Sequence, residues 1–529
     1  MKWISSAHKA TQRVLVSQQY LLLRVGSCPR YFHASNTIGW SKSYQIQASS
    51  LFSGRYYSIS ANQNVTKSSS YSFCRLPYAY NKLGNSIKNV DLEIISRESI
   101  KPASPTPHHL RTFNLSIIDQ YMFDVYTPLI LFLPNTDNTS VTNVVTKRSK
   151  HLKEALSKIL TQFYPLAGRV KENLHIECND EGVYYSEARV NQKLKDFLCH
   201  PDDEKVRELM PESPCIAESL LGNYVIRIQV NFFLCGGIGI STSVSHKIFD
   251  GHTFHMFMKA WAAAARGSQD ILSPSFVASE IFPNNPHLEH PSPSKIMATK
   301  TLSTKRFVFD STTLAFLKNQ LIVMPSSGHP PTRMEATTAV IWKAVAKAAS
   351  KVRPFGPQSP HALFSAVNLR KRASPPLPKD SIGNLIDGAG AICFPKRELH
   401  LPTLIGELRE SIAKINSDHI ESMKGEKGHE ILRKLKQPMD VTREGDCIMA
   451  SSMLNSGMYN LDFGWGKPVW FYIMNAGFDR FLALNETLKG GGVEAIVTLS
   501  LEEMEIFERD PELLSYATVN PSPLRFLKH

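Results

Sequence analysis

The segment HKIFDG, residues 246–251, does most to decide the fold and the chemistry of this chain. Ahead of it, residues 225–234 have the composition of a strand, Gly236-Gly237 that of a turn, and residues 238–244 alternate Ile, Thr and Val with small residues. This pattern predicts two antiparallel strands and places His246 where the second strand ends. Asp250 follows four residues later, so an imidazole base and a carboxylate can meet at one turn.

The stretch after this motif, residues 253–266, is rich in Ala, Met and Phe and predicts a buried helix. An earlier amphipathic helix is expected from residue 150 to 163, closed by Pro165 and Gly168. Strand-like segments alternate with helical ones on both sides of residue 300. We therefore expect an α/β protein with two similar layers.

A second segment, DFGWG at residues 462–466, is much rarer in protein sequences than a His–Asp pair. Gly464 and Gly466 bracket Trp465 in a way that suits a tight turn. A His four residues ahead of an Asp is by itself compatible with a chance pairing. The two segments in this order are more specific than either alone.

Together, HKIFDG and DFGWG resemble the signature motifs of the plant BAHD acyltransferase family. The resemblance extends over roughly residues 90 to 525. The further segments that carry it are IKPASPTP (100–107), NLSIIDQ (114–120), FYPLAGR (163–169), ATTAVIWKA (336–344), VNLRKR (367–372), Gly383-Asn384, SSM (451–453) and VEAIVTLSLEEM (493–504).

The resemblance implies two α/β domains of the chloramphenicol acetyltransferase type, with the active-site channel at their interface. It implies that His246 is the catalytic base and that Asp250 turns away from the channel to pair with Arg370. A buried Asp–Arg pair of this kind supports the site, because removing either partner leaves a buried charge. Gly251 belongs to the same supporting turn.

For DFGWG the resemblance leaves two roles open. Asp462 either maintains the conformation of its loop or takes part in proton transfer as a second catalytic residue. The remaining residues of the segment, Phe463, Gly464, Trp465 and Gly466, are expected to shape the channel and its acyl-CoA side. Ser452 resembles a position near the pantetheine arm of CoA.

The composition agrees with a globular enzyme: 42% of the residues are hydrophobic and 20% are charged. No stretch approaches the ~18 apolar residues of a membrane span. The net charge of +13 comes almost wholly from residues 1–90, which hold eleven Lys and Arg and no acid, leaving 49 basic against 47 acidic residues. We therefore expect no nucleic-acid partner. The eight Cys show no metal-binding spacing, so we expect no metal and no bound cofactor.

The first 88 residues have the composition of an organellar transit peptide and not of a folded domain. On a helical wheel, Lys2, Lys9, Arg13 and Arg24 fall on one side and Ile4, Leu15 and Leu22 on the other. Such a cationic amphipathic helix favours a mitochondrial destination. A cytoplasmic protein with a leader of no function is the alternative, since members of the family usually begin near Asn89.

The domains are thus expected at 1–88 for the leader, 89–300 for the half carrying HKIFDG, and 301–529 for the half carrying DFGWG. A Pro- and His-rich segment from 273 to 294 precedes the boundary and resembles the family's long crossover. We expect a monomer.

Within the family, IKPASPTP, NLSIIDQ, VNLR and SIGN most resemble the vinorine synthase-like branch of alkaloid and terpenoid O-acetyltransferases. The resemblance implies acetyl transfer from acetyl-CoA, the co-substrate, to a hydroxyl of a small-molecule alcohol. Three alternatives remain: a carnitine-type acyltransferase, a thioester hydrolase, and a non-catalytic acyl-CoA-binding protein. The DFGWG segment argues against the first, and the intact HKIFDG against the last.

A fusion of residues 1–60 to a fluorescent reporter tests the leader. We expect the fusion to collect in mitochondria, because its cationic amphipathic helix lacks acidic residues. Fluorescence microscopy with a mitochondrial marker measures this. Diffuse cytosolic signal would contradict the mitochondrial destination.

Overall fold

The computed structural model describes residues 90–211, 224–288, 298, 300–322, 329–352, 360–394, 398–433 and 446–526. They belong to one compact unit, residues 79–529. The leader at 1–88, with its predicted helix and its destination, lies outside the described residues.

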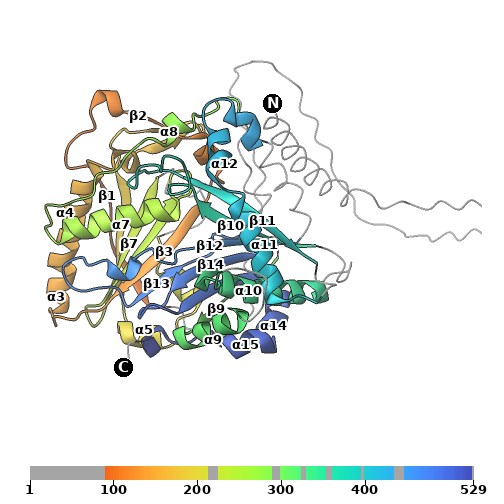
Figure 1. The fold of residues 1–529 in the computed structure, drawn as a ribbon. Coiled ribbons are helices and arrows are strands. Elements are labelled where there is room, and N and C mark those ends of the chain that lie inside the picture. Colours follow the sequence, from red (N-terminus) through yellow and green to blue (C-terminus); the bar gives the residue numbers. More distant parts are fainter. Residues whose placement is uncertain are drawn as a thin grey trace, which may run out of the picture. The chain divides into compact units, whose positions relative to one another are not determined.

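Two sheets carry the fold (Figure 1). The first has the strand order β1-β6-β7-β8-β3-β13 and the second the order β11-β10-β12-β14-β15-β9-β16. The first-sheet strands are β1 (Leu92–Ile100), β3 (Tyr126–Leu133), β6 (Val183–Val190), β7 (Ile226–Phe233), β8 (Ile238–Ser245) and β13 (Trp470–Ile473). The second-sheet strands are β9 (Leu302–Phe309), β10 (His361–Asn368), β11 (Ile386–Cys393), β12 (Asp446–Ser452), β14 (Phe481–Glu486), β15 (Val493–Ser500) and β16 (Thr518–Val519).

A three-stranded sheet, β2-β5-β4, stands beside them. Its strands are β2 (Thr112–Asn114), β4 (Arg169–Lys171) and β5 (His175–Glu177). The helices are α2 (Ile117–Tyr121), α3 (Val141–Asn143), α4 (Ser149–Leu160), α5 (Leu194–Cys199), α6 (Asp203–Glu208), α7 (Gly251–Ala265), α8 (Ala278–Ile281), α9 (Ser311–Ile322), α10 (Arg333–Val352), α11 (Leu401–Ala413), α12 (Ser417–Met423), α14 (Leu501–Phe507) and α15 (Pro511–Tyr516).

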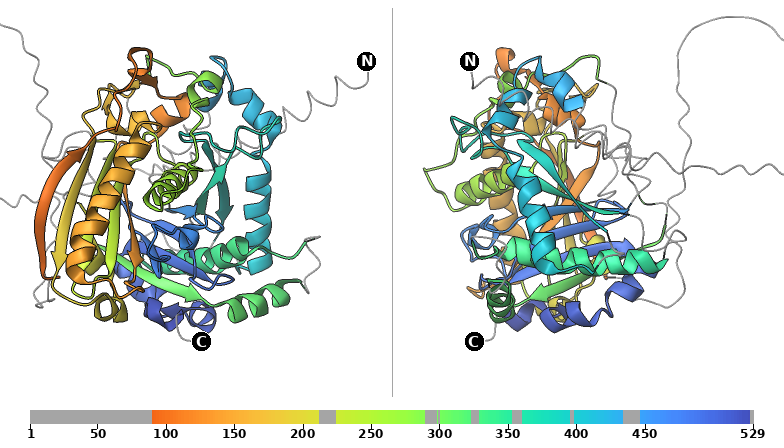
Figure 2. Two further views of the ribbon diagram at one scale, coloured as in Figure 1. Left: turned by 90° about the vertical axis from the view of Figure 1, so that its left-hand side faces the viewer. Right: turned by 45° about the vertical axis from the view of Figure 1, so that its right-hand side comes forward.

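The elements predicted around the motif agree with the structure to within a few residues. Strands β7 and β8 pair antiparallel, and both are buried along their whole length. Helix α7 packs beside α4 (Figures 1 and 2). Trp261 of α7 donates a hydrogen bond to the carbonyl oxygen of Leu152 of α4 at 3.0 Å. The α/β fold with two sheet-bearing halves is therefore as expected.

One strand departs from a clean division of the chain at residue 300. Strand β13 follows DFGWG in the sequence, yet it pairs antiparallel with β3 and completes the first sheet. Trp470 lies opposite Phe132 in this pairing, with the rings stacked at 5.3 Å. The boundary at 300 remains a prediction, and the half that follows it contributes one strand to the sheet of the other.

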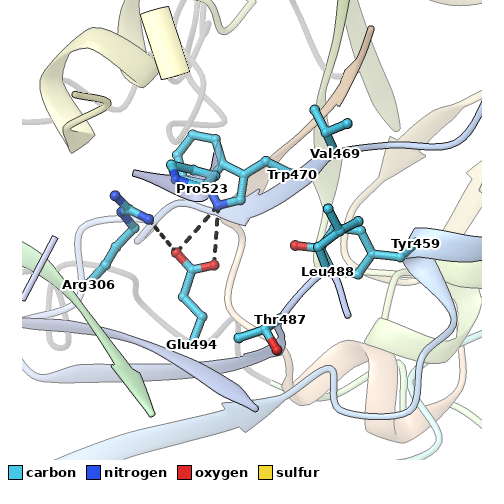
Figure 3. Close-up of a pocket in the computed structure, with 8 residues that line it drawn as sticks. All are labelled: Arg306, Tyr459, Val469, Trp470, Thr487, Leu488, Glu494 and Pro523. Atoms are coloured by element: carbon cyan, nitrogen blue, oxygen red, sulfur yellow. Dashed lines mark hydrogen bonds and ion pairs between the residues drawn. The ribbon is translucent and has the colours of Figure 1, made fainter. Parts of the chain in front are cut away.

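A buried polar cluster joins β13 to the second sheet (Figure 3). Arg306 on β9 and Glu494 on β15 form an ion pair at 2.8 Å, each about 95% buried. The indole nitrogen of Trp470 donates to Glu494 at 3.2 Å. The adjoining cavity has a volume of only about 10 Å³, far less than a typical small-molecule site. Its polar groups satisfy one another, so we assign this cluster to holding the two sheets together.

Candidate active site

His246 lies where β8 ends, as the sequence predicts. Its backbone N–H donates to the carbonyl oxygen of Val125 at 2.9 Å, which fixes the chain as it leaves the sheet. The side chain keeps partial exposure, whereas its Nδ1 is buried. Burial lowers the pKa of His246 below its usual 6.5. The imidazole is therefore a neutral, unprotonated base at neutral pH.

Asp250 is the N-cap of α7, and its carboxylate is fully engaged by groups other than His246. Oδ1 accepts from the backbone N–H of Thr253 at 2.8 Å, which caps the helix. Oδ2 accepts from Nη1 of Arg370 at 2.6 Å, with the two side chains only 1% and 3% exposed. Burial alone would raise the pKa of Asp250, but Arg370 and Thr253 hold it below its usual value.

Arg370 in turn reaches the SIGN segment, residues 381–384. Its guanidinium donates to the carbonyl oxygens of Ser381 at 3.0 Å and Gly383 at 3.1 Å. The pair implied by the resemblance is thus present, and it ties the first turn of α7 to a loop 120 residues farther along the chain. The position of Asp250 is that of a supporting residue.

Gly251 and Ser452 lie on the same side of the molecule as this pair. Gly251 begins α7, and a Cβ atom there would lie 2.5 Å from Sδ of Met453. A larger residue at 251 would therefore require the side chain of Met453 to move. Ser452, next to Met453, is exposed at the end of β12. Its contact with pantetheine stays a prediction.

The DFGWG segment lies at the other end of α7. Oδ1 of Asp462 accepts from the backbone N–H of Gly464 at 2.8 Å and of Gly466 at 3.2 Å. Both glycines have positive φ angles, 104° and 118°, a conformation that other residues rarely adopt. Phe463 packs edge-on against Trp261 at 5.5 Å. Asp462 therefore closes its own turn.

Two cationic side chains also hold the DFGWG segment in place. Arg266, the residue after α7, donates to the carbonyl oxygen of Asp462, and Arg148 stacks on Trp465 at 5.2 Å. Helix α7 has 15 residues, so its two ends are ~22 Å apart. The described hydrogen bonds of the Asp462 carboxylate go to its own turn and not to His246, and a part for Asp462 in proton transfer stays a prediction.

Sequence reasoning assigned no role to two residues at the HKIFDG turn, Asn384, which contacts it, and Lys247, which lies in it. Asn384 donates from its side chain to the carbonyl oxygen of His246 at 2.7 Å and to Asp119 at 2.9 Å. Lys247, 2% exposed, donates to the carbonyl oxygens of Gln120 at 3.3 Å and Met122. Burial lowers the pKa of Lys247 to about 8. The NLSIIDQ and Gly383-Asn384 segments can be identified in the sequence. Their contacts with the HKIFDG motif cannot be predicted from it.

Within the described ranges, no cluster of His, Cys, Asp and Glu has the arrangement of a metal site. No helix in that part of the chain is long and apolar enough to cross a bilayer.

Comparison with known proteins decides the family. The model of the Transferase family matches residues 90–514. The chain belongs to the BAHD acyltransferases. Among its relatives, the limonoid 7-O-acetyltransferase of Citrus sinensis is 36% identical, over 82% of this chain and 99% of that protein. The stemmadenine O-acetyltransferase of Catharanthus roseus is 33% identical, over 79% and 96%.

Among solved structures, this BAHD chain is similar to vinorine synthase. The two share 32% sequence identity and superpose with a TM-score of 0.70, covering 82% of this chain and 100% of that one. The resemblance seen in the sequence, to the family and to its vinorine synthase-like branch, is confirmed.

Replacing Asp250 by Ala tests the supporting pair. We expect the free energy of unfolding to fall by about 3–5 kcal/mol, because Arg370 is left buried without its counter-charge. The melting temperature and the activity should fall with it. Denaturant unfolding monitored by circular dichroism measures the loss. Asp270→Ala, at an exposed loop position, is the control. An Asp250→Ala protein as stable as wild type would argue against this role.

Proposed function

We propose that this enzyme transfers an acetyl group from acetyl-CoA to a hydroxyl of a plant alkaloid or terpenoid, with His246 as general base. The observation that carries the proposal is a partly exposed residue at the end of β8, His246, whose pKa is lowered by burial so that its imidazole is neutral at neutral pH. Its neighbouring carboxylate is already committed to Arg370. The relatives' names support O-acetylation, of a limonoid in one case and of stemmadenine in another.

The chemistry needs one base that works in both directions. As the acceptor hydroxyl attacks the thioester carbonyl, Nε2 of His246 takes its proton, so a free alkoxide never forms. The C–O bond forms and a tetrahedral intermediate results. When the C–S bond breaks, the imidazolium returns the proton to the departing thiolate of CoA. The proton taken from the hydroxyl is thus the one returned to the thiolate, and the reaction needs neither a covalent acyl-enzyme nor a metal ion.

We propose that the active molecule is a monomer, as the family resemblance implies. We further propose a mitochondrial location, with the cytoplasm as the alternative, on the composition of the leader.

The test is release of free CoA by the protein lacking residues 1–88, supplied with acetyl-CoA and a panel of alkaloid and terpenoid alcohols. We expect release that depends on one class of acceptor, with the acetylated product identified by mass spectrometry. Release without any acceptor would identify a thioester hydrolase instead. Release that depends on carnitine would identify a carnitine-type acyltransferase.

His246→Ala separates catalysis from binding. We expect acetyl transfer to fall at least ~100-fold while acetyl-CoA still binds and the melting temperature stays near that of wild type, since the residue is the base. His109→Ala, at an exposed position outside the motif, is the matched control. Near-normal turnover by His246→Ala would remove it from the base role.

A further inference from the structure

Two buried polar atoms on a pair of contacting residues lack hydrogen-bond partners among the described residues: Nδ1 of His246 and Oδ1 of Asn384. Buried polar groups are nearly always hydrogen-bonded, since an unpaired one destabilises the folded state. The two residues are already joined, because Nδ2 of Asn384 donates to the carbonyl oxygen of His246 at 2.7 Å. The unpaired atoms therefore belong to one arrangement.

The orientation of the Asn384 amide is fixed by its other partner, Asp119. The backbone N–H and Nδ2 of Asn384 both donate to Oδ1 of Asp119, at 2.7 and 2.9 Å. Asp119 is 0% exposed, and its Oδ2 accepts from the backbone N–H and the hydroxyl of Ser116 at 2.9 and 2.7 Å. Both partners of Nδ2 are acceptors, so the amide cannot be flipped, and its Oδ1 remains free to accept.

The charged groups around His246 are all directed elsewhere. Asp250 binds Arg370, and Lys247 binds the backbone carbonyls of Gln120 and Met122. Asp119 is occupied by Asn384 and Ser116. Burial lowers the pKa of His246, and its own backbone, Asp250 and the side chain of Asn384 oppose that fall. Of the two side chains, Asp250 is committed to Arg370, so the neutral amide of Asn384 is the one available to orient the imidazole.

We propose that Asn384 is the positioning residue of His246, its Oδ1 accepting a hydrogen bond from Nδ1–H, directly or through one water. This bond keeps the proton of the neutral imidazole on Nδ1 and leaves the lone pair of Nε2 for the acceptor hydroxyl. When Nε2 takes the proton, the ring becomes cationic and its bond to Oδ1 strengthens. The amide itself neither gains nor loses a proton. The inference rests on the proposed base role of His246.

Asn384→Ala and Asn384→Ser test it in the protein lacking residues 1–88. The Ser variant keeps the backbone hydrogen bond to Asp119 and a polar side chain. Its hydroxyl is one bond shorter than the amide, so it withdraws the Oδ1 acceptor from Nδ1–H. We expect kcat to fall about 10- to 100-fold in both variants, with KM for acetyl-CoA within about threefold of wild type.

A second readout does not need turnover. The rate at which diethyl pyrocarbonate modifies His246, followed by peptide mass spectrometry across a pH series, reports the pKa of its imidazole. Wild type should titrate below 6.5, and both variants lower still, because losing the acceptor destabilises the imidazolium. The acid limb of kcat/KM should move to lower pH in parallel.

Asn231→Ala is the control, because Asn231 is also 0% exposed and hydrogen-bonded, but lies on β7 against Leu209 and Ser241. It should lose stability with no change in the His246 titration. Asn384 variants that melt lower but keep the wild-type kcat and titration would overturn the proposal. A changed titration in a protein that transfers no acyl group would refute the proposed function and leave the positioning role standing.

Discussion

The buried ion pair between Asp250 and Arg370 is the interaction on which the site depends. It lies between the first turn of α7 and the loop after β10, and both charges are almost completely removed from water. Such a pair is strongly destabilised if one partner is lost, so it permits few other arrangements of the two segments. Because Arg370 also binds the carbonyls of Ser381 and Gly383, it places the SIGN segment, and with it Asn384, beside the His246 backbone.

The two signature motifs bracket one helix. HKIFDG precedes the N-terminus of α7, whose cap is Asp250, and DFGWG packs against Trp261 and Arg266 at its C-terminal end. The turn of DFGWG then leads into β13, which completes the first sheet, while Trp470 binds Glu494 of the second. DFGWG therefore helps to set the position of the HKIFDG turn, because it fixes the C-terminal end of α7 and leads into the strand that joins the sheets.

Much of this arrangement could be predicted from the sequence. Strands β7 and β8 and helix α7 follow from alternation and from a long apolar run, and the Asp250–Arg370 pair from the family resemblance. The contacts of Asn384 with Asp119 and His246 could not be predicted, since they join positions 265 and 138 residues apart. Nor could the place of β13, because a strand of four residues has no period that identifies its partner. For β7, β8 and α7 the local pattern predicts the element, whereas the neighbours of β13 and Asn384 are selected by tertiary packing.

The central claim is that the buried Asp250–Arg370 pair holds the HKIFDG turn in place. A double-mutant cycle on these two residues tests it most directly. Unfolding free energies would be measured for wild type, Asp250→Ala, Arg370→Ala and the double variant. The account predicts strong coupling, with the double variant little less stable than either single one, because removing the second charge relieves the first of its unpaired burial. Additive losses would show that the two side chains stabilise the protein independently, and would contradict the account.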